Sequence, residues 1–111
     1  MTIFGGDHPH IGSITTLTRN LTPKTFNFPS HSGRFHKDHY ISQKVAQILS
    51  SALPGTCTIT AGFHIDHISK KQIQTSILLS VKLAKQIKNW LKSQDLKVSK
   101  PIYYSDKEKP K

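Results

Sequence analysis

The sequence predicts an α+β fold, in which a small, largely antiparallel sheet carries two helices on one face and the C-terminal helix is long. Three observations lead to this prediction. Stretches rich in β-branched residues precede and separate two segments in which apolar residues recur at helical spacing. The 111 residues are enough for one domain. Because only 35% of them are apolar, the core of that domain must be small.

The first part of the chain predicts short strands and turns. Residues 1–4 are typical of the end of a strand, and Gly5-Gly6-Asp7 predicts a tight turn. Residues 10–18 are rich in Ile and Thr and predict a second strand. A further short extended segment is expected around residues 25–28, and residues 30–35 are expected to form a loop.

The first predicted helix begins after Asp38, whose side chain can cap it. Apolar residues then fall on one helical face as far as Leu53, where Pro54-Gly55 ends the helix. Residues 56–61 are the clearest strand of the sequence, because apolar residues and threonines alternate along it. Cys57 lies on the apolar side of this strand, so we expect it to be a small core residue.

The second predicted helix is long: Ser69 and Gln72 fit a capping box at its start, and the helix runs to about Ser93. Its apolar side chains cover more than one narrow stripe, which favours burial both against the sheet and against a second copy of the chain. We therefore expect a homodimer. Residues 1–96 are predicted to form a single domain and residues 97–111 a basic, disordered tail.

Charge and cysteine content limit the classes of function. The chain has 16 Lys and Arg against 6 Asp and Glu, a formal net charge of +10, which favours anionic partners. Only this charge points to nucleic acid, and a solvated helix face explains it equally well, so nucleic acid is not expected as a partner. The single cysteine excludes a disulfide framework. Without a membrane-spanning apolar run or a secretory signal, we expect a soluble, cytoplasmic chain.

The histidines are unusually placed. All seven fall between residues 8 and 67, and three of them directly follow an aspartate. These pairs are Asp7-His8, Asp38-His39 and Asp66-His67. A single pair of this kind is usually only a surface hydrogen bond. Three pairs at the ends of three predicted elements indicate a shared site, because such ends can converge on one rim of a small α+β domain.

Three chemistries are open to this set of side chains. His64 and Asp66 could help to hold a divalent metal, although no fixed ligand spacing such as HExxH is present. A histidine could act as a general acid or base, although the sequence identifies no nucleophile. Backbone N–H groups and basic side chains could instead bind a phosphate. The candidate donors for a phosphate are Gly5, Gly6, Gly12, Arg34, Lys37 and the histidines.

The same three segments carry a family resemblance. They are Gly-Gly-Asp-His-Pro-His-Ile-Gly at residues 5–12, His-Lys-Asp at residues 36–38 and Ala-Gly-Phe-His-Ile-Asp-His-Ile-Ser at residues 61–69. In this order and spacing they resemble the LpdD-like family, over roughly residues 3–92. Members of that family are small proteins associated with UbiD-type decarboxylases and described as prenylated-flavin chaperones. Their fold is similar to that of proteasome assembly chaperones.

The resemblance implies a non-enzymatic chaperone that holds a prenylated flavin of the FMN type, or FMN itself, for a UbiD-like decarboxylase. Glycine N–H groups and Lys37 would cradle the phosphate, histidines would donate hydrogen bonds, and Asp66 would orient a histidine. No catalytic or metal-binding residue is implied. The implied cofactor-binding residues are Gly5, Gly6, His10, Gly12, His36, Lys37, His64 and Asp66. The alternatives are a dimeric assembly factor without a ligand and a metal-dependent enzyme.

Overall fold

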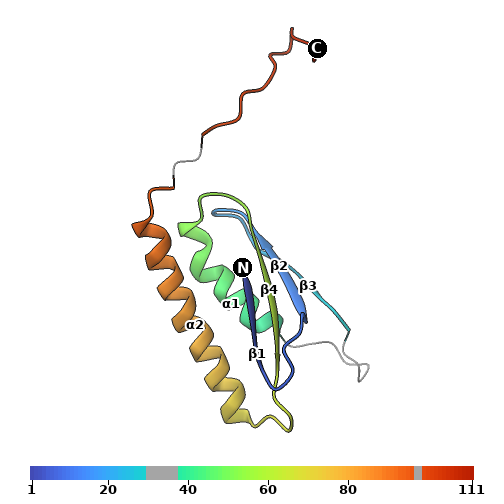
Figure 1. Ribbon diagram of the computed structural model, residues 1–111, viewed down its shortest axis with the longest axis vertical. Coiled ribbons are helices and arrows are strands. Elements are labelled where there is room, and N and C mark those ends of the chain that lie inside the picture. Colours follow the sequence, from blue (N-terminus) through green and yellow to red (C-terminus); the bar gives the residue numbers. More distant parts are fainter. Residues whose placement is uncertain (30–37, 97–98) are drawn as a thin grey trace.

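A computed structural model describes residues 1–29, 38–96 and 99–111, and it confirms the predicted α+β class. The described part of the chain contains four strands, two α-helices and one short 3-10 helix (Figure 1). In chain order they are β1 (Thr2–Gly6), β2 (Ser13–Leu17), β3 (Lys24–Asn27), α1 (His39–Leu49), η1 (Ser50–Ala52), β4 (Cys57–His64) and α2 (Lys70–Ser93).

The four strands form one mixed sheet in the order β1-β4-β2-β3. β2 pairs antiparallel with both β3 and β4, whereas β1 pairs parallel with β4. The sheet is therefore mixed and not purely antiparallel, because β4 returns from α1 to lie between β1 and β2. Since β1 and β4 run in the same direction, their C-terminal ends lie at the same end of the sheet, where β2 begins.

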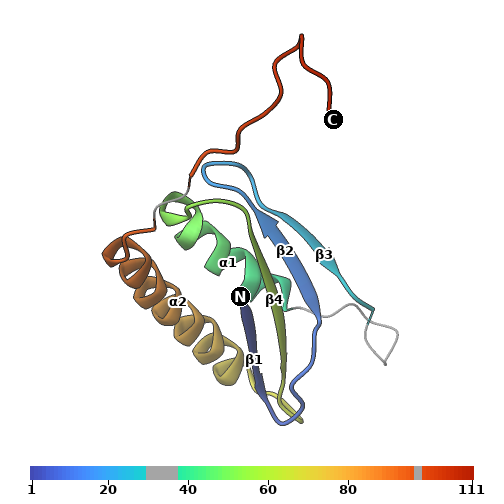
Figure 2. The same cartoon turned by 45° about the horizontal axis from the view of Figure 1, so that its top comes forward.

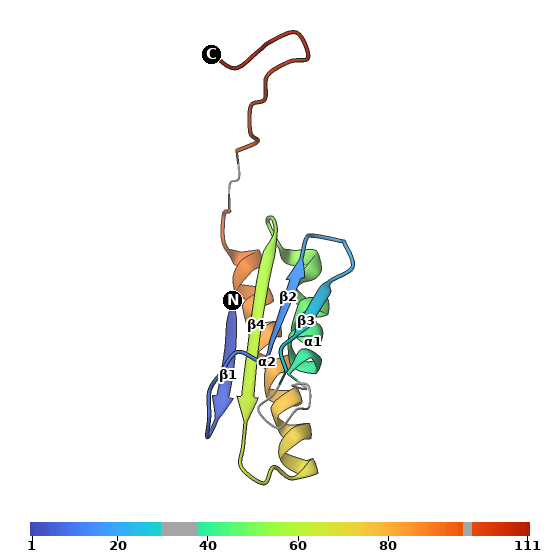
Figure 3. The same ribbon diagram turned by 90° about the vertical axis from the view of Figure 1, so that its right-hand side faces the viewer.

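Both helices cover one face of the sheet (Figure 3). The core between the two layers is small, as the composition predicts. Alternate residues of β2 and β4 point into it, and one face of α1 packs on them. Burying each of the larger side chains contributes about 1.5–3 kcal/mol. The buried apolar residues are Leu17, Ile41, Val45, Ala46, Leu49, Leu53, Ile59, Ala61 and Ala84.

A buried set of hydroxyl groups joins α1 to the sheet. The Thr15 hydroxyl donates to the Ser42 hydroxyl over 2.8 Å, and the Thr15 and Thr25 hydroxyl oxygens lie 2.8 Å apart. Ser13 approaches the same Ser42 oxygen at 3.3 Å. Because these groups satisfy one another, their burial is tolerated, and they fix the position of α1 over β2 and β3.

The predicted long helix is confirmed, including its start. Ser69 accepts a hydrogen bond from the Gln72 N–H over 3.1 Å, and the Gln72 side chain accepts one from the Ser69 N–H over 2.8 Å. Only Ser80 and Ala84 of α2 are buried, so much of the apolar surface of this helix is exposed.

Among the described residues, no helix is both long and apolar enough to cross a membrane.

The predicted Gly5-Gly6-Asp7 turn is wrong for the glycines, because both extend β1 in register with β4, and the chain turns only after Gly6, whose φ is +80°. Residues 99–111 contain no helix or strand. The domain boundary after residue 96 stays a prediction, and the loop predicted at residues 30–35 lies outside the described residues.

Candidate functional site

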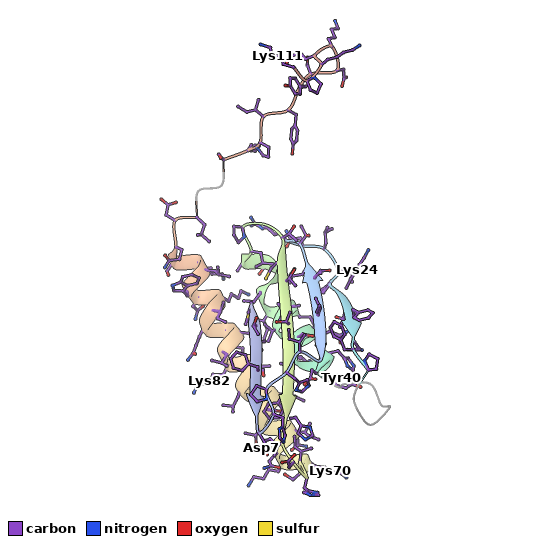
Figure 4. The ribbon with its side chains drawn as sticks, turned by 45° about the vertical axis from the view of Figure 1, so that its right-hand side comes forward. Asp7, Lys24, Tyr40, Lys70, Lys82 and Lys111 are labelled. Atoms are coloured by element: carbon purple, nitrogen blue, oxygen red, sulfur yellow. The ribbon has the colours of Figure 1, made fainter. Side chains whose placement is uncertain are left out.

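The shared ends of β1 and β4 and the start of β2 form one end of the sheet, at the bottom of Figures 1 and 2. We call this end the rim and define it as residues 5–12, residues 62–66 and Asp38. Figure 4 shows Asp7 at this end of the molecule, together with Lys70 at the beginning of α2. Two of the three predicted histidine segments meet here in full, and Asp38 is the described part of the third.

Asp66 is the centre of a small polar cluster on the rim. Its Oδ1 lies 3.1 Å from His64 Nε2 and 3.3 Å from His8 Nε2. The two imidazole rings are 5.5 Å apart between centroids. The Asp66 N–H also donates to Asp7 Oδ2 over 3.0 Å, so the loop after β4 is tied to the loop after β1. One carboxylate thus orients two imidazoles, and all three groups remain open to solvent.

The cluster changes the acidity of Asp66. The hydrogen bond from His64 is the main cause that holds the pKa of the Asp66 carboxyl below its ordinary value of 3.8. Partial desolvation opposes this effect, while the hydrogen bond from His8 and the positive charge of both imidazoles strengthen it. A lowered pKa in the folded state stabilises the fold above pH 3.8, and this contribution is lost as the pH falls through the lowered value.

We predict that His64→Ala raises the pKa of Asp66 back towards 3.8, because the largest stabilising contact of the carboxylate is then removed. Carbon-detected NMR titration of the side-chain carboxyl measures this directly. His67→Asn is the matched control, since His67 follows Asp66 directly but makes none of the contacts of the cluster; its φ of +52° is one that asparagine tolerates. An unchanged Asp66 titration in His64→Ala contradicts the arrangement.

Asp38 lies at the start of α1 as predicted, but its side chain does not cap the helix. The carboxylate turns away from α1 and accepts a hydrogen bond from the Phe63 N–H over 2.8 Å. Its other oxygen lies 3.3 Å from His10 Nε2. Asp38 is only 5% exposed, so it is a buried anchor between α1, β4 and the loop that carries His10. The predicted cap is wrong because a tertiary partner takes the carboxylate.

His10 is held at both ring nitrogens. Its Nδ1 lies 2.9 Å from the His8 carbonyl oxygen, which accepts the hydrogen bond, and its Nε2 faces Asp38. Both ring nitrogens of His10 thus already face an oxygen of the protein. His10 and His64 are thereby connected, because His8 contributes its carbonyl to one and shares Asp66 with the other.

Glycines allow the loop between β1 and β2 to pack directly on β4. A Cβ on Gly62 would lie 1.5 Å from the His10 carbonyl oxygen, and one on Gly6 would lie 2.0 Å from the His64 carbonyl oxygen. The Gly12 N–H donates to the Ala61 carbonyl oxygen over 2.8 Å. Gly12 therefore holds the loop on the sheet in this structure, where its N–H already has a partner.

Six of the eight predicted site residues lie together on the rim. They are Gly5, Gly6, His10, Gly12, His64 and Asp66. His36 and Lys37 lie outside the described residues. The implied cofactor-binding residues did not include His8, for which the Asp7-His8 pair was a usable signal. They did not include Gly62 either, although it lies in the third segment of the family resemblance, and the packing of the loop shows why a glycine is needed there. Within the described ranges, no group of three or more His, Cys, Asp or Glu side chains is arranged so that it could hold a metal ion.

The chain is similar to known proteins over most of its length. Residues 1–92 match the family of the prenylated flavin chaperone LpdD-like domain. Protein LpdD of Lactiplantibacillus plantarum is 45% identical over 109 residues, which cover 98% of this chain and 80% of that protein.

Proposed function

The chain belongs to the prenylated flavin chaperone LpdD-like family, and on this premise we propose that it binds a prenylated FMN-type flavin and holds it for a UbiD-like decarboxylase. Membership of a chaperone family points to a binding protein and not to an enzyme. The observation that supports the proposal best is the meeting of Gly6, His10 and His64 on one rim, from segments more than 50 residues apart.

The rim has the groups that a phosphate needs. Asp66 contacts Nε2 of His64 and so fixes the orientation of the ring, which leaves Nδ1 as the atom that can donate to a phosphate when the ring is protonated. Gly6 brings the backbone to the same place without a side chain. A net charge of +10 favours the approach of an anionic ligand. The predicted contributions of His36 and Lys37 would add to this set.

Anaerobic gel filtration with prenylated FMN, and in parallel with FMN, tests the binding. We expect the flavin absorbance to elute with the protein. We also expect the loaded protein to activate a cofactor-free UbiD-like decarboxylase faster than free flavin does. A folded protein that elutes without flavin, at concentrations that load the decarboxylase, contradicts the proposal and favours a scaffold without a ligand.

We further propose a homodimer formed through the C-terminal half of α2. Trp90 lies there with 58% of its surface exposed, which is unusual for the only tryptophan of a small domain. Trp90→Glu is therefore expected to shift the protein from dimer to monomer in sedimentation velocity, because a buried unpaired charge weakens an apolar interface. Asn89→Glu, at the exposed residue directly before Trp90, is the control. A wild-type monomer at all concentrations contradicts the dimer.

A further inference from the structure

A groove of about 420 Å³ runs between β1 and the N-terminal half of α2. β1 is an edge strand, so its outer side is not paired with another strand of the described sheet. In Figures 1 and 2, α2 runs alongside β1 from the rim upwards. Ile3, Phe63, Leu79 and Leu83 are among the apolar side chains that line the groove.

The lining is chemically apolar, although it includes serines. The Ser76 hydroxyl donates to the Ile73 carbonyl and the Ser80 hydroxyl donates to the Ser76 carbonyl, so both donors are already used within α2. Lys71 is the one ionisable residue among those that line the groove in the described chain. An apolar cavity of this size with a single cation is typical of a small-molecule site.

The groove is continuous with the rim. Gly5 and Gly62 line the groove and also belong to the rim, and Lys71 lies in the first turn of α2, next to Lys70, which Figure 4 shows at the same end. A ligand with an apolar body and an anionic end can therefore place its body along α2 and its charge beside Lys71, at the rim end of the groove. A flavin that carries a phosphate and a prenyl-derived ring has this form.

We propose that the groove binds the fused ring system of the flavin and that Lys71 binds its phosphate. This inference rests on the proposed function and specifies it: the site extends from the rim along α2, and it recognises an aromatic and aliphatic surface as well as an anion. Phe63, Leu79 and Leu83 pack on the rings, and the absence of a side chain at Gly5 leaves the groove open at the rim.

Two pairs of variants test the groove. Leu83→Glu places a carboxylate in it, and Leu78→Glu places the same charge on α2 outside it; both leucines are exposed, at 51% and 69%, so both variants should fold. Lys71→Ala removes the cation of the groove, and Lys70→Ala removes its neighbour, which does not line it. Binding of prenylated FMN, FMN and riboflavin, which lacks the phosphate, is measured by anaerobic fluorescence titration.

We expect Leu83→Glu to weaken the binding of all three flavins by about tenfold or more, since the new charge must be desolvated against the rings. We expect Lys71→Ala to weaken the binding of only the two phosphate-bearing flavins. Both control variants, Leu78→Glu and Lys70→Ala, should bind all three flavins as wild type does. If Leu83→Glu binds like wild type while wild type binds flavin, the groove is not the ring site and the proposed function stands. The same holds if Leu83→Glu changes only the sedimentation of the protein, because the groove is then an interface between copies. If wild type binds no flavin, both proposals are wrong.

Discussion

Gly62→Ala is expected to destabilise the protein by about 3 kcal/mol, because the new methyl group has no room and the obstructing atom cannot rotate away. The added Cβ would lie 1.5 Å from the His10 carbonyl oxygen, 2.3 Å from its carbonyl carbon and 3.0 Å from the Ile11 nitrogen, all of which are backbone atoms. Either β4 or the loop that carries His10 must move. For a domain of this size the loss corresponds to a fall of roughly 12–24 °C in the midpoint of thermal unfolding.

Gly55→Ala is the matched control for this prediction. No atom lies within 4 Å of the position that its Cβ would occupy, so alanine there should leave the stability unchanged or raise it by about 0.4–1 kcal/mol. Circular dichroism during thermal unfolding measures both variants. Equal midpoints for Gly62→Ala and Gly55→Ala would contradict the packing of the loop on β4, and with it the placement of His10.

The double variant His10→Ala, His64→Ala is expected to bind prenylated FMN about a hundredfold more weakly than wild type. His64 supplies a hydrogen bond from Nδ1 to the phosphate, and a hydrogen bond to a charged group contributes about 1.5–3 kcal/mol. Both ring nitrogens of His10 contact the His8 carbonyl and Asp38, so His10 acts by holding the loop in place beside His64. About 1.4 kcal/mol corresponds to a factor of ten in affinity, so we expect a loss of at least tenfold from each substitution. The effect should be largest for phosphate-bearing flavins and small for riboflavin, because the rim is proposed to bind the phosphate.

His67→Asn serves as the control for the flavin measurement, because it removes a histidine from the same loop without touching the cluster around Asp66. Thermal unfolding of each single variant separates a lost site from a lost fold, and the exposed His64 should be replaced at little cost in stability. If the double variant folds and binds prenylated FMN as wild type does, the rim histidines have no part in the site.

Local sequence patterns predicted those parts of the fold that local interactions determine. The alternation along residues 56–61 predicted β4, and Ser69 with Gln72 predicted the start of α2, because a capping box is complete within four residues. The family resemblance is confirmed. The meeting of two histidine segments could also be anticipated, since each lies at the end of a strand.

Features that depend on distant partners could not be predicted. The sequence does not show that β1 lies parallel to β4, so Gly5 and Gly6 were assigned to a turn when they continue a strand. Asp38 has the position of a helix cap, but the Phe63 N–H and His10 take its carboxylate. The need for glycine at residue 62 comes from the carbonyl of His10, 52 residues earlier in the chain.

NMR mapping of the bound flavin tests most directly whether the rim is the binding site. On titration of labelled protein with FMN, and anaerobically with prenylated FMN, we predict one saturable transition in which the Gly6 amide and the ring signals of His10 and His64 shift together. Signals from the far end of α2, such as those of Lys92, should stay in place. Saturable shifts confined to the far end of α2, with the rim signals unmoved, would contradict the account.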